Sequence, residues 1–160
     1  DEHAGFYSEE VFQSVHRHNE AHYSAFSRLV RATFDEALSC FSEQSVDLLH
    51  IDGRHFYEDV KHDFEVWRPK LSKRAVVLFH DTNVRERDFG VFRLWGELAA
   101  QYPAFEFLHG HGVGGLGYGA ALPPEVKAFF RAGADSTTAA DLRCAYSRLG
   151  SAVKADFETR

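Results

Sequence analysis

Two apolar runs, separated by a helical pattern, constrain the fold of this chain more than any other feature. Residues 46–51 (VDLLHI) and 75–79 (AVVLF) are nearly continuous apolar stretches, typical of strands buried on both faces of a parallel sheet. Between them, large apolar residues recur at three- and four-residue steps, which indicates one stripe of a helix. These residues are Tyr57, Val60, Phe64 and Trp67. The order strand, helix, strand predicts a βαβ unit and an α/β fold.

Each predicted strand ends in residues that bind metals or transfer protons. The first strand is followed by Asp52 and His55, and the second ends in His80 and Asp81. In open α/β sheets, ligands bind beyond the carboxyl ends of the strands. A single Asp after a strand is also ordinary chemistry for a turn or a helix cap. It is the convergence of four such residues on one edge that favours a metal site or an acid–base site.

The rest of the chain contains no internal repeats and no linker rich in Pro or Ser, so we expect a single domain over residues 1–160. Residues 1–25 predict a loop and a helix capped by Ser8. Residues 26–121 predict the strands and helices of the sheet, including a strand at 26–33, and residues 122–160 predict C-terminal helices. Within these parts, further helices are expected at 34–41, from 91 to about 102, at 125–131 and from 142, and further strands at 105–109 and 113–121.

Composition narrows the classes of function. The chain is 44% hydrophobic and 26% charged, as is usual for a globular protein, and no apolar stretch approaches the length of a membrane span. Its net charge of −6 argues against general nucleic-acid binding. The two cysteines, Cys40 and Cys144, form no metal-binding motif and are typical of reduced cytosolic thiols. We therefore expect a cytoplasmic protein with a small-molecule substrate and no nucleic-acid or membrane partner.

Residues 112–117 (GVGGLG) match the G-x-G-x-x-G pattern of dinucleotide-binding loops. Such a loop must open directly into a helix, with another strand and an acidic residue further on. Here the glycines lie within a predicted strand and are followed by Pro123 and Pro124. We expect these glycines to permit a close approach of the backbone to its neighbours instead.

Residues 51–71 (IDGRHFYEDVKHDFEVWRPKL) and 75–82 (AVVLFHDT) resemble class I S-adenosylmethionine-dependent methyltransferases. The similarity is to the type 24 branch, which is similar to sugar O-methyltransferases and cephalosporin-hydroxylase-like proteins, and it extends over nearly all of the chain. It implies a Rossmann-like methyltransferase sheet. It also implies an O-methyltransferase that acts on a hydroxyl of a sugar or a natural-product-like small molecule. The implied cofactors are S-adenosylmethionine and a divalent metal, Mg²⁺ or Mn²⁺.

The resemblance assigns roles to individual residues. Asp52 would bind the metal and lie among the cofactor-binding residues, and His55 is the candidate general base. His80 and Asp81 stand where metal-dependent relatives have a Glu-Asp pair of metal ligands. An imidazole at position 80 suits Mn²⁺, Fe²⁺ or Zn²⁺ better than Mg²⁺. Loop residues that can touch the substrate are Arg85, Arg87 and His111.

The glycine-rich loop and the ribose-binding acid of such methyltransferases are not found before Phe26. We therefore expect a sheet that lacks its first two strands, in a chain cut from something longer, because the chain contains no Met and begins at Asp1. Thr33 and Phe34 would lie near the adenine, and we expect the isolated chain to bind S-adenosylmethionine weakly or not at all. The exposed edge of such a sheet favours pairing with another chain, so we expect a homo-oligomer.

Two other functions remain open. His50-x-Asp52 matches part of the facial triad of non-haem iron oxygenases, with His80 or His109 as the third ligand, although the usual scaffold of that triad is an all-β jelly roll. The other is a non-catalytic or truncated methyltransferase-like module, which the missing glycine loop favours. A phosphohydrolase of the HD type is disfavoured, because its His-Asp pair lies on helices and His80 ends a predicted strand.

Overall fold

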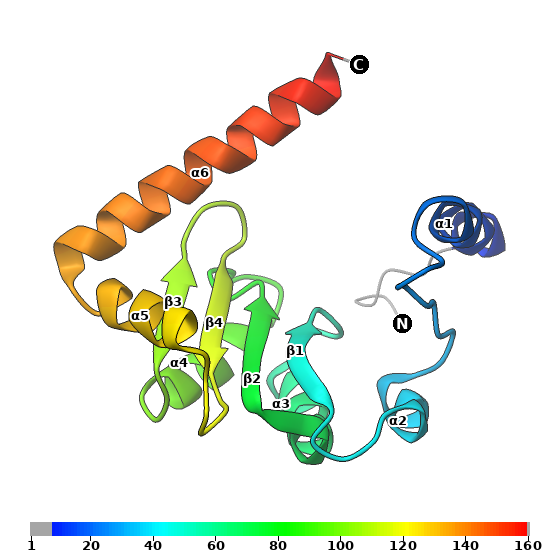
Figure 1. Ribbon diagram of the computed structural model, residues 1–160, viewed down its shortest axis with the longest axis horizontal. Helices are drawn as coiled ribbons and strands as arrows, with labels where there is room; N and C mark the ends of the chain where they lie inside the picture. The colour runs from blue at the N-terminus through cyan, green and yellow to red at the C-terminus, as the bar shows by residue number, and fades with distance from the viewer. Residues whose placement is uncertain (1–7, 160) are drawn as a thin grey trace. The chain divides into compact units, whose positions relative to one another are not determined.

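The computed structural model describes residues 8–159 (Figure 1), so the loop expected for residues 1–7 lies outside the described residues. The chain divides into two compact units, Asp1–Phe41 and Ser42–Arg160. The described part of the first unit is helical, and the second unit contains the sheet. The expectation of a single domain over the whole chain stays a prediction.

The first unit contains two helices and a short 3₁₀ segment. Helix α1 (Glu9–His22) begins after Ser8, whose hydroxyl accepts a hydrogen bond from a backbone N–H of the first turn, as expected. Helix α2 (Phe34–Ala37) begins after Thr33 and continues into the 3₁₀ segment η1 (Leu38–Cys40). Helix α1 therefore begins where its capping residue predicted.

The strand predicted at residues 26–33 is wrong, because this segment is irregular. A strand is stabilised by hydrogen bonds to a neighbouring strand, and the described part of the first unit offers none. The segment instead contacts α1 through its side chains. Arg31 forms an ion pair with Glu9 at 2.6 Å, and the hydroxyl of Ser27 donates a hydrogen bond to Asn19 at 2.6 Å.

The second unit contains a four-stranded mixed sheet in the order β1-β2-β4-β3 (Figure 1). Strands β1 and β2 are parallel, whereas β4 is antiparallel to both of its neighbours. The βαβ unit and the mixed α/β class are therefore confirmed. The bounds of the strands and of the helical segments between β1 and β2 are β1 Val46–Ile51, α3 Tyr57–Trp67, η2 Arg68–Lys70, β2 Leu71–His80, β3 Ala104–Phe107 and β4 Val113–Gly117.

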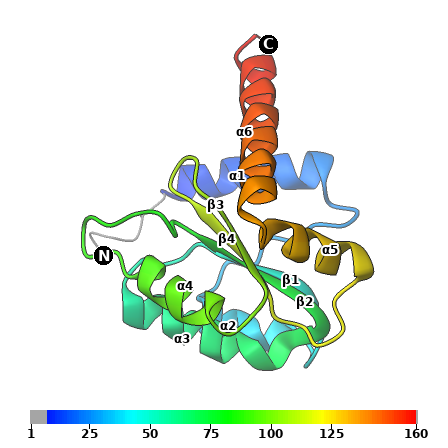
Figure 2. The ribbon, with the colours of Figure 1, turned by 90° about the vertical axis from the view of Figure 1, so that its left-hand side faces the viewer.

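Helices cover both faces of this sheet (Figure 2). Helices α3 and α4 (Val91–Ala99) pack on one face, and α5 (Pro124–Gly133) packs against β3 and β4 on the other. Helix α6 (Ser136–Glu158) follows α5 and extends beyond the sheet. Within residues 8–159, none of the helices is long and apolar enough to cross a membrane.

The apolar stripe predicted for α3 forms part of the main core. Phe64 is 2% exposed, and its ring lies 5.6 Å from that of the fully buried Phe79 on β2. Fully burying one such side chain contributes about 1.5–3 kcal/mol. The core residues therefore fix α3 against β2 and hold the carboxyl ends of β1 and β2 at the same edge.

Strand β1 differs from the prediction of burial on both faces. Only Ile51 is buried, and Leu48 is 61% exposed. The reason is the position of the strand in the sheet: among the described residues, β1 is an edge strand that pairs with β2 alone. The apolar run predicted a strand correctly, but it could not predict which neighbours would cover that strand.

The glycines of residues 112–117 serve close packing, as expected. They lie in and next to β4, which does not open into a helix. A Cβ added at Gly114 would lie 2.6 Å from the ring of Trp95, and one at Gly117 would lie 2.9 Å from Leu122. These distances leave no room for a side chain at positions 114 and 117.

Candidate functional site

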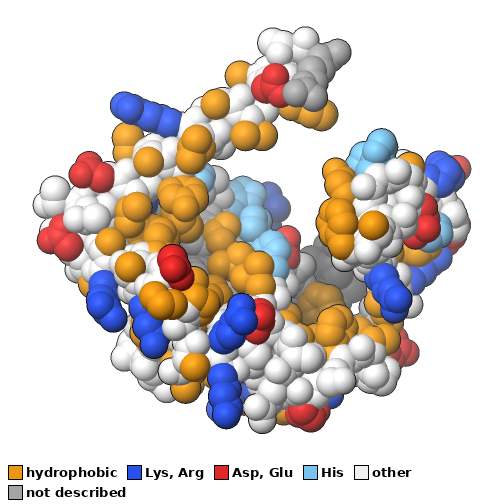
Figure 3. Space-filling model, in the orientation of Figure 1, with side chains coloured by type: hydrophobic (Ala, Val, Ile, Leu, Met, Phe, Trp, Pro, Cys, Tyr) orange, Lys and Arg blue, Asp and Glu red, His pale blue; other side chains and the backbone are white. Residues whose placement is uncertain are grey.

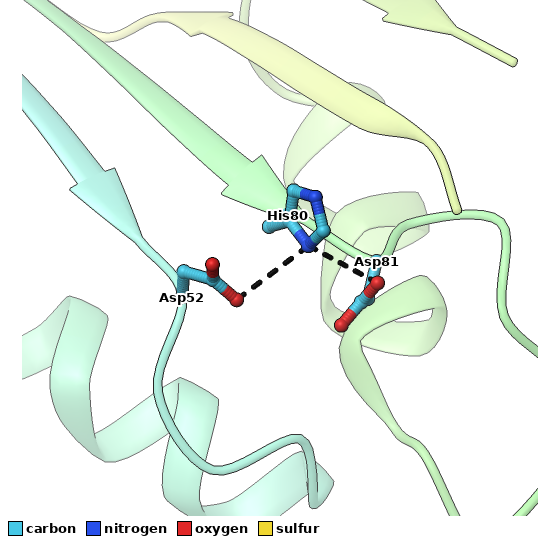
Figure 4. Close-up of side chains that lie close together, drawn as sticks. All are labelled: Asp52, His80 and Asp81. Atoms are coloured by element: carbon cyan, nitrogen blue, oxygen red, sulfur yellow. Dashed lines mark ion pairs between the residues drawn. The ribbon is translucent and has the colours of Figure 1, made fainter. Parts of the chain in front are cut away.

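Acidic and histidine side chains meet at the carboxyl ends of β1 and β2 (Figure 4). Asp52 directly follows β1, His80 is the last residue of β2, and Asp81 follows it. The parallel register pairs Ile51 with Phe79, which brings the residues after them to the same level. One donor atom from each of Asp52, His80 and Asp81 lies within 4.8 Å of the others.

His80 lies between the two carboxylates, as Figure 4 shows. Its Nδ1 atom is 3.5 Å from Asp52 Oδ1 and 3.1 Å from Asp81 Oδ1. His55 approaches from the loop after β1, with Nε2 at 2.7 Å from Asp81 Oδ2 and 3.6 Å from Asp52 Oδ1. Histidine side chains accordingly gather at this edge of the sheet in the space-filling view (Figure 3). All four residues that were singled out after the predicted strands are thus brought together.

Asp81 is the centre of this cluster. Its side chain is only 7% exposed, and its backbone has a φ of 60°, in the left-handed region that non-glycine residues rarely adopt. Among the described residues, neither Asp81 Oδ1 nor His80 Nδ1 has a hydrogen-bond partner, although both atoms are buried. Leaving such groups unpaired costs about 1–3 kcal/mol each, and more when they are charged. Nitrogen and oxygen atoms that are close together but not aligned for hydrogen bonds are suited to bind one cation as metal ligands.

The donor set fits a divalent metal ion. Two ligands held at about 2.0–2.1 Å from one ion lie about 3 Å apart at right angles and about 3.3 Å apart in a tetrahedron. The separations from His80 Nδ1 to Asp81 Oδ1 and to Asp52 Oδ1 are 3.1 and 3.5 Å. Two carboxylates and an imidazole suit Mn²⁺, Fe²⁺ or Zn²⁺ better than Mg²⁺.

The loop after β2 fixes the orientation of His55. The ring of Phe89 stacks on the imidazole in parallel, with centroids 4.4 Å apart. Gly90 N–H donates a hydrogen bond to the carbonyl of His55 at 2.7 Å. A Cβ at Gly90 would overlap Tyr57, so only glycine permits this approach. His55 is therefore held against Asp81 by its stacking partner and by its own backbone.

Thr33 and Phe34, the residues expected near the adenine, belong to the first unit. The hydroxyl of Thr33 accepts a hydrogen bond from the backbone N–H of Glu36 and lies 3.0 Å from the Glu36 carboxylate, which also accepts from Thr33 N–H. Phe34 is 41% exposed. Thr33 thus has a structural role as a helix cap, and cofactor contact by either residue stays a prediction.

The iron facial triad is not assembled. The group of candidate ligands found within residues 8–159 does not include His50 or His109. The ring of His50 lies 6.1 Å from that of His80, and His109 packs against Phe107. The scaffold is α/β rather than a jelly roll.

One close neighbour of Asp81 was not predicted as part of the cluster. His111 Nδ1 lies 3.3 Å from Asp81 Oδ1, whereas the sequence placed His111 only among the loop residues near the substrate. The antiparallel pairing of His80 with Val113 brings this loop to the end of β2. Asn83 holds it there, since its backbone N–H donates to the carbonyl of His111 at 2.9 Å. The flanking Gly110 and Gly112 were the only local signal of an unusual loop.

Comparison with known proteins identifies the family. The profile of a family described as a methyltransferase domain matches residues 1–82, which is half of the chain. The chain belongs to this family, the type 24 branch of class I S-adenosylmethionine-dependent methyltransferases. Its mixed sheet is accordingly a Rossmann-like methyltransferase sheet that lacks some of its strands.

The chain is also similar to a much longer protein. It is 60% identical over 119 residues to the uncharacterized protein y4gI of Sinorhizobium fredii (strain NBRC 101917 / NGR234). The aligned part covers 74% of this chain but only 13% of that relative. No solved structure matches this chain.

Proposed function

We propose that this chain carries the catalytic part of an S-adenosylmethionine-dependent O-methyltransferase that is assisted by a divalent metal ion. The observation that carries the proposal is the convergence of Asp52, His80 and Asp81 beside His55 at the carboxyl edge of the sheet. Membership of the methyltransferase family supports the reaction class. His80 Nδ1 and Asp81 Oδ1, which are buried and have no hydrogen-bond partner among the described residues, support the involvement of a cation.

Each residue of the cluster has a distinct role in this proposal. Asp52, His80 and Asp81 would hold the divalent ion, and that ion would lower the pKa of an acceptor hydroxyl. His55 takes the proton of that hydroxyl. His55 Nε2 lies 2.7 Å from Asp81 Oδ2. Asp81 thus orients the base as well as binding the cation.

S-adenosylmethionine, when bound, would supply the methyl group to the acceptor oxygen and leave as S-adenosylhomocysteine. The residues of the site contribute mainly by holding the acceptor oxygen in line with the bond between that methyl group and sulfur. Because His55 receives the proton, the charge balance of the step is complete.

A hydroxylated small molecule is the acceptor that the neighbouring cavity supports best. This cavity of about 340 Å³ is lined by Asn83, Val84, Arg85, Glu86, Gly110 and His111. Its volume lies in the usual range for small-molecule sites. Arg85 is held in place by hydrogen bonding to the carbonyl of Thr82 at 2.8 Å. Amide, guanidinium, carboxylate and imidazole groups around one space are suited to the hydroxyl groups of a sugar or similar natural product.

We also propose that the chain forms a homo-oligomer through β1. Within residues 8–159 this strand pairs on one side only, and its Leu48 side chain is 61% exposed. An open, partly apolar strand edge favours pairing with a strand of another chain.

A transfer assay on the purified chain tests the proposed function. S-adenosylhomocysteine formation would be measured with a panel of sugars and phenols, with and without Mn²⁺. We expect activity that depends on acceptor and on Mn²⁺, that is lost in His55→Ala and Asp81→Asn, and that persists in His109→Ala. The control residue His109 is an exposed histidine outside the cluster. Turnover that survives both site substitutions would contradict the proposal, and turnover without any divalent ion would contradict its metal-dependent part.

Binding of S-adenosylmethionine is tested separately by calorimetry. We expect weak binding or none by this chain alone, so the transfer assay is run at millimolar cofactor concentrations, where weak binding still supports turnover. Micromolar affinity would contradict the expectation of a chain that holds only part of the cofactor site.

A further inference from the structure

We propose that His111 is a fourth protein ligand of the divalent ion, an inference that rests on the proposed function. His111 would extend the ligand set to two carboxylates and two imidazoles. A site with two imidazole ligands should prefer transition-metal ions to Mg²⁺, because Mg²⁺ favours oxygen ligands. A site built of carboxylates alone would lack this selectivity.

The first support is the position of the His111 side chain. Its Nδ1 atom lies 3.3 Å from Asp81 Oδ1, and His80 Nδ1 lies 3.1 Å from the same oxygen. Both separations match those of two ligands around one ion, which are about 3.0–3.3 Å. Two imidazole nitrogens therefore approach one buried carboxylate oxygen from different elements, β2 and the loop before β4.

The second support is the unsatisfied state of that oxygen. The side chain of Asp81 is more than nine-tenths buried, and within the described part of the chain its Oδ1 atom has no hydrogen-bond partner. If His80 or His111 served only to neutralise Asp81, a well-aligned N–H···O bond to this oxygen would be expected. Both imidazoles therefore contact this oxygen without satisfying it. His111 lies outside the group of ligand atoms that are within 4.8 Å of one another, so its side chain must reorient to share an ion with His80.

The third support is the loop that carries His111. Its flanking residues, Gly110 and Gly112, have φ values of 62° and 88°, which glycine adopts without strain. The backbone of the loop is tied to β2 by the hydrogen bond from Asn83 N–H to the His111 carbonyl. The side chain itself remains 74% exposed. The backbone is thus anchored near Asp81, while the imidazole is free to reorient toward an ion.

The location of His111 also links the ion to the substrate. His111 lines the cavity of about 340 Å³ next to the cluster, together with Arg85 and Glu86. A ligand in this place would border both the ion and the cavity proposed for the acceptor. We therefore expect the loss of His111 to weaken metal binding directly, rather than through the fold.

Metal titrations of the intact chain test this inference without relying on catalysis. Mn²⁺ binding would be followed by calorimetry and by the electron paramagnetic resonance signal of free Mn²⁺, and Mg²⁺ binding by calorimetry. The proteins compared are the wild type, His111→Ala and the matched control His109→Ala, whose histidine is exposed on the same loop. The fluorescence of the buried Trp67 and Trp95 would verify that each variant is folded.

We expect His111→Ala to weaken Mn²⁺ binding by about tenfold or more, since even indirect partners of a metal site contribute about 10–100-fold. His109→Ala should bind Mn²⁺ like the wild type, and Mg²⁺ binding should change little in either variant. In the Co²⁺-loaded protein, the visible absorption spectrum should differ between wild type and His111→Ala, because an imidazole ligand has been removed.

The outcomes separate this inference from the proposed function. If the wild type binds Mn²⁺ and His111→Ala binds it equally well with an unchanged Co²⁺ spectrum, His111 is not a ligand, and the proposed metal site stands without it. If the wild type binds no Mn²⁺, Co²⁺ or Zn²⁺, the metal-dependent part of the proposed function fails, and this inference fails with it.

Discussion

Substituting Gly112 by alanine perturbs the loop that brings His111 to Asp81. Gly112 is buried and has a φ of 88°. An added Cβ would lie 2.7 Å from the backbone nitrogen of Asn83 and 2.8 Å from Thr82 Oγ1. Distances below 3 Å cannot be kept, so either the loop or the end of β2 must move. That movement would disrupt the hydrogen bond from Asn83 N–H to the carbonyl of His111.

The expected loss of stability has two parts. An L-residue in the left-handed region costs about 1–2 kcal/mol, and crowding in a packed site costs about 1–3 kcal/mol. Gly112→Ala should therefore lower the free energy of unfolding by about 2–5 kcal/mol. Gly110 is the matched control, because it has a φ of 62° but no atom within 4 Å of an added Cβ. Gly110→Ala should lose only the conformational part, about 1–2 kcal/mol.

Urea unfolding followed by tryptophan fluorescence measures both variants. The chain has two tryptophans, Trp67 and Trp95, and both are buried in the core of the second unit. The signal therefore reports on the unit that carries the site. If Gly112→Ala loses no more stability than Gly110→Ala, the close approach of residue 112 to Asn83 is refuted, and with it the anchoring of the His111 loop.

Three further predictions concern the core, a helix cap and the open edge of the sheet. Phe64→Ala should lower the free energy of unfolding by about 3–5 kcal/mol, measured by the same fluorescence assay; a loss near zero would contradict its place in the core. The pKa of the Asp135 carboxyl is lowered below its usual value by the hydrogen bond from the backbone N–H of Thr138 at the start of α6. Its capping contribution is therefore present above the ordinary pKa and lost as the pH falls through the lowered value. Circular dichroism should show that acidification removes less helix from Asp135→Asn than from the wild type, because asparagine keeps the cap without a charge that can be lost. Equal losses would refute the capping of α6 by the Asp135 carboxylate. Leu48→Lys should convert the oligomer into a monomer, which light scattering would detect as a lower molecular mass. A wild type that is already monomeric at high concentration would contradict pairing through β1.

The spacing of apolar residues along the sequence predicted those helices and strands in which this spacing follows the buried face. The apolar runs of β1 and β2 and the stripe of α3 were predicted correctly, because their spacing reflects the face that is buried. The strand expected at residues 26–33 failed, since a strand needs a partner and the described part of the first unit supplies none. The burial of β1 failed for a related reason, because Leu48 lies on an edge strand.

The part of the candidate site that lies at the ends of the parallel strands β1 and β2 could be predicted from the sequence. Residues after the carboxyl ends of β1 and β2 meet at one edge, which is why Asp52, His80 and Asp81 were expected together and lie together. His111 could not be assigned in this way. It reaches Asp81 only through the antiparallel pairing of His80 with Val113, a contact between residues distant in sequence that no local pattern specifies.

The energetics of Asp81 bear on whether this is a working site or a decayed one. A buried carboxylate whose Oδ1 atom has no hydrogen-bond partner among residues 8–159, in a backbone conformation that costs a non-glycine residue about 1–3 kcal/mol, is unfavourable for folding. An asparagine at this position would tolerate the same φ without burying a charge. In a module with only a structural role, this strain would lower stability without any benefit to function. Substitutions that relieve such strain are common and would be neutral for function there. The strain is explained if a cation, held also by Asp52 and His80, compensates the charge when it binds. Metal binding should therefore stabilise the second unit against urea in the wild type and not in Asp81→Asn, whose uncharged side chain should leave the metal-free protein at least as stable as the wild type.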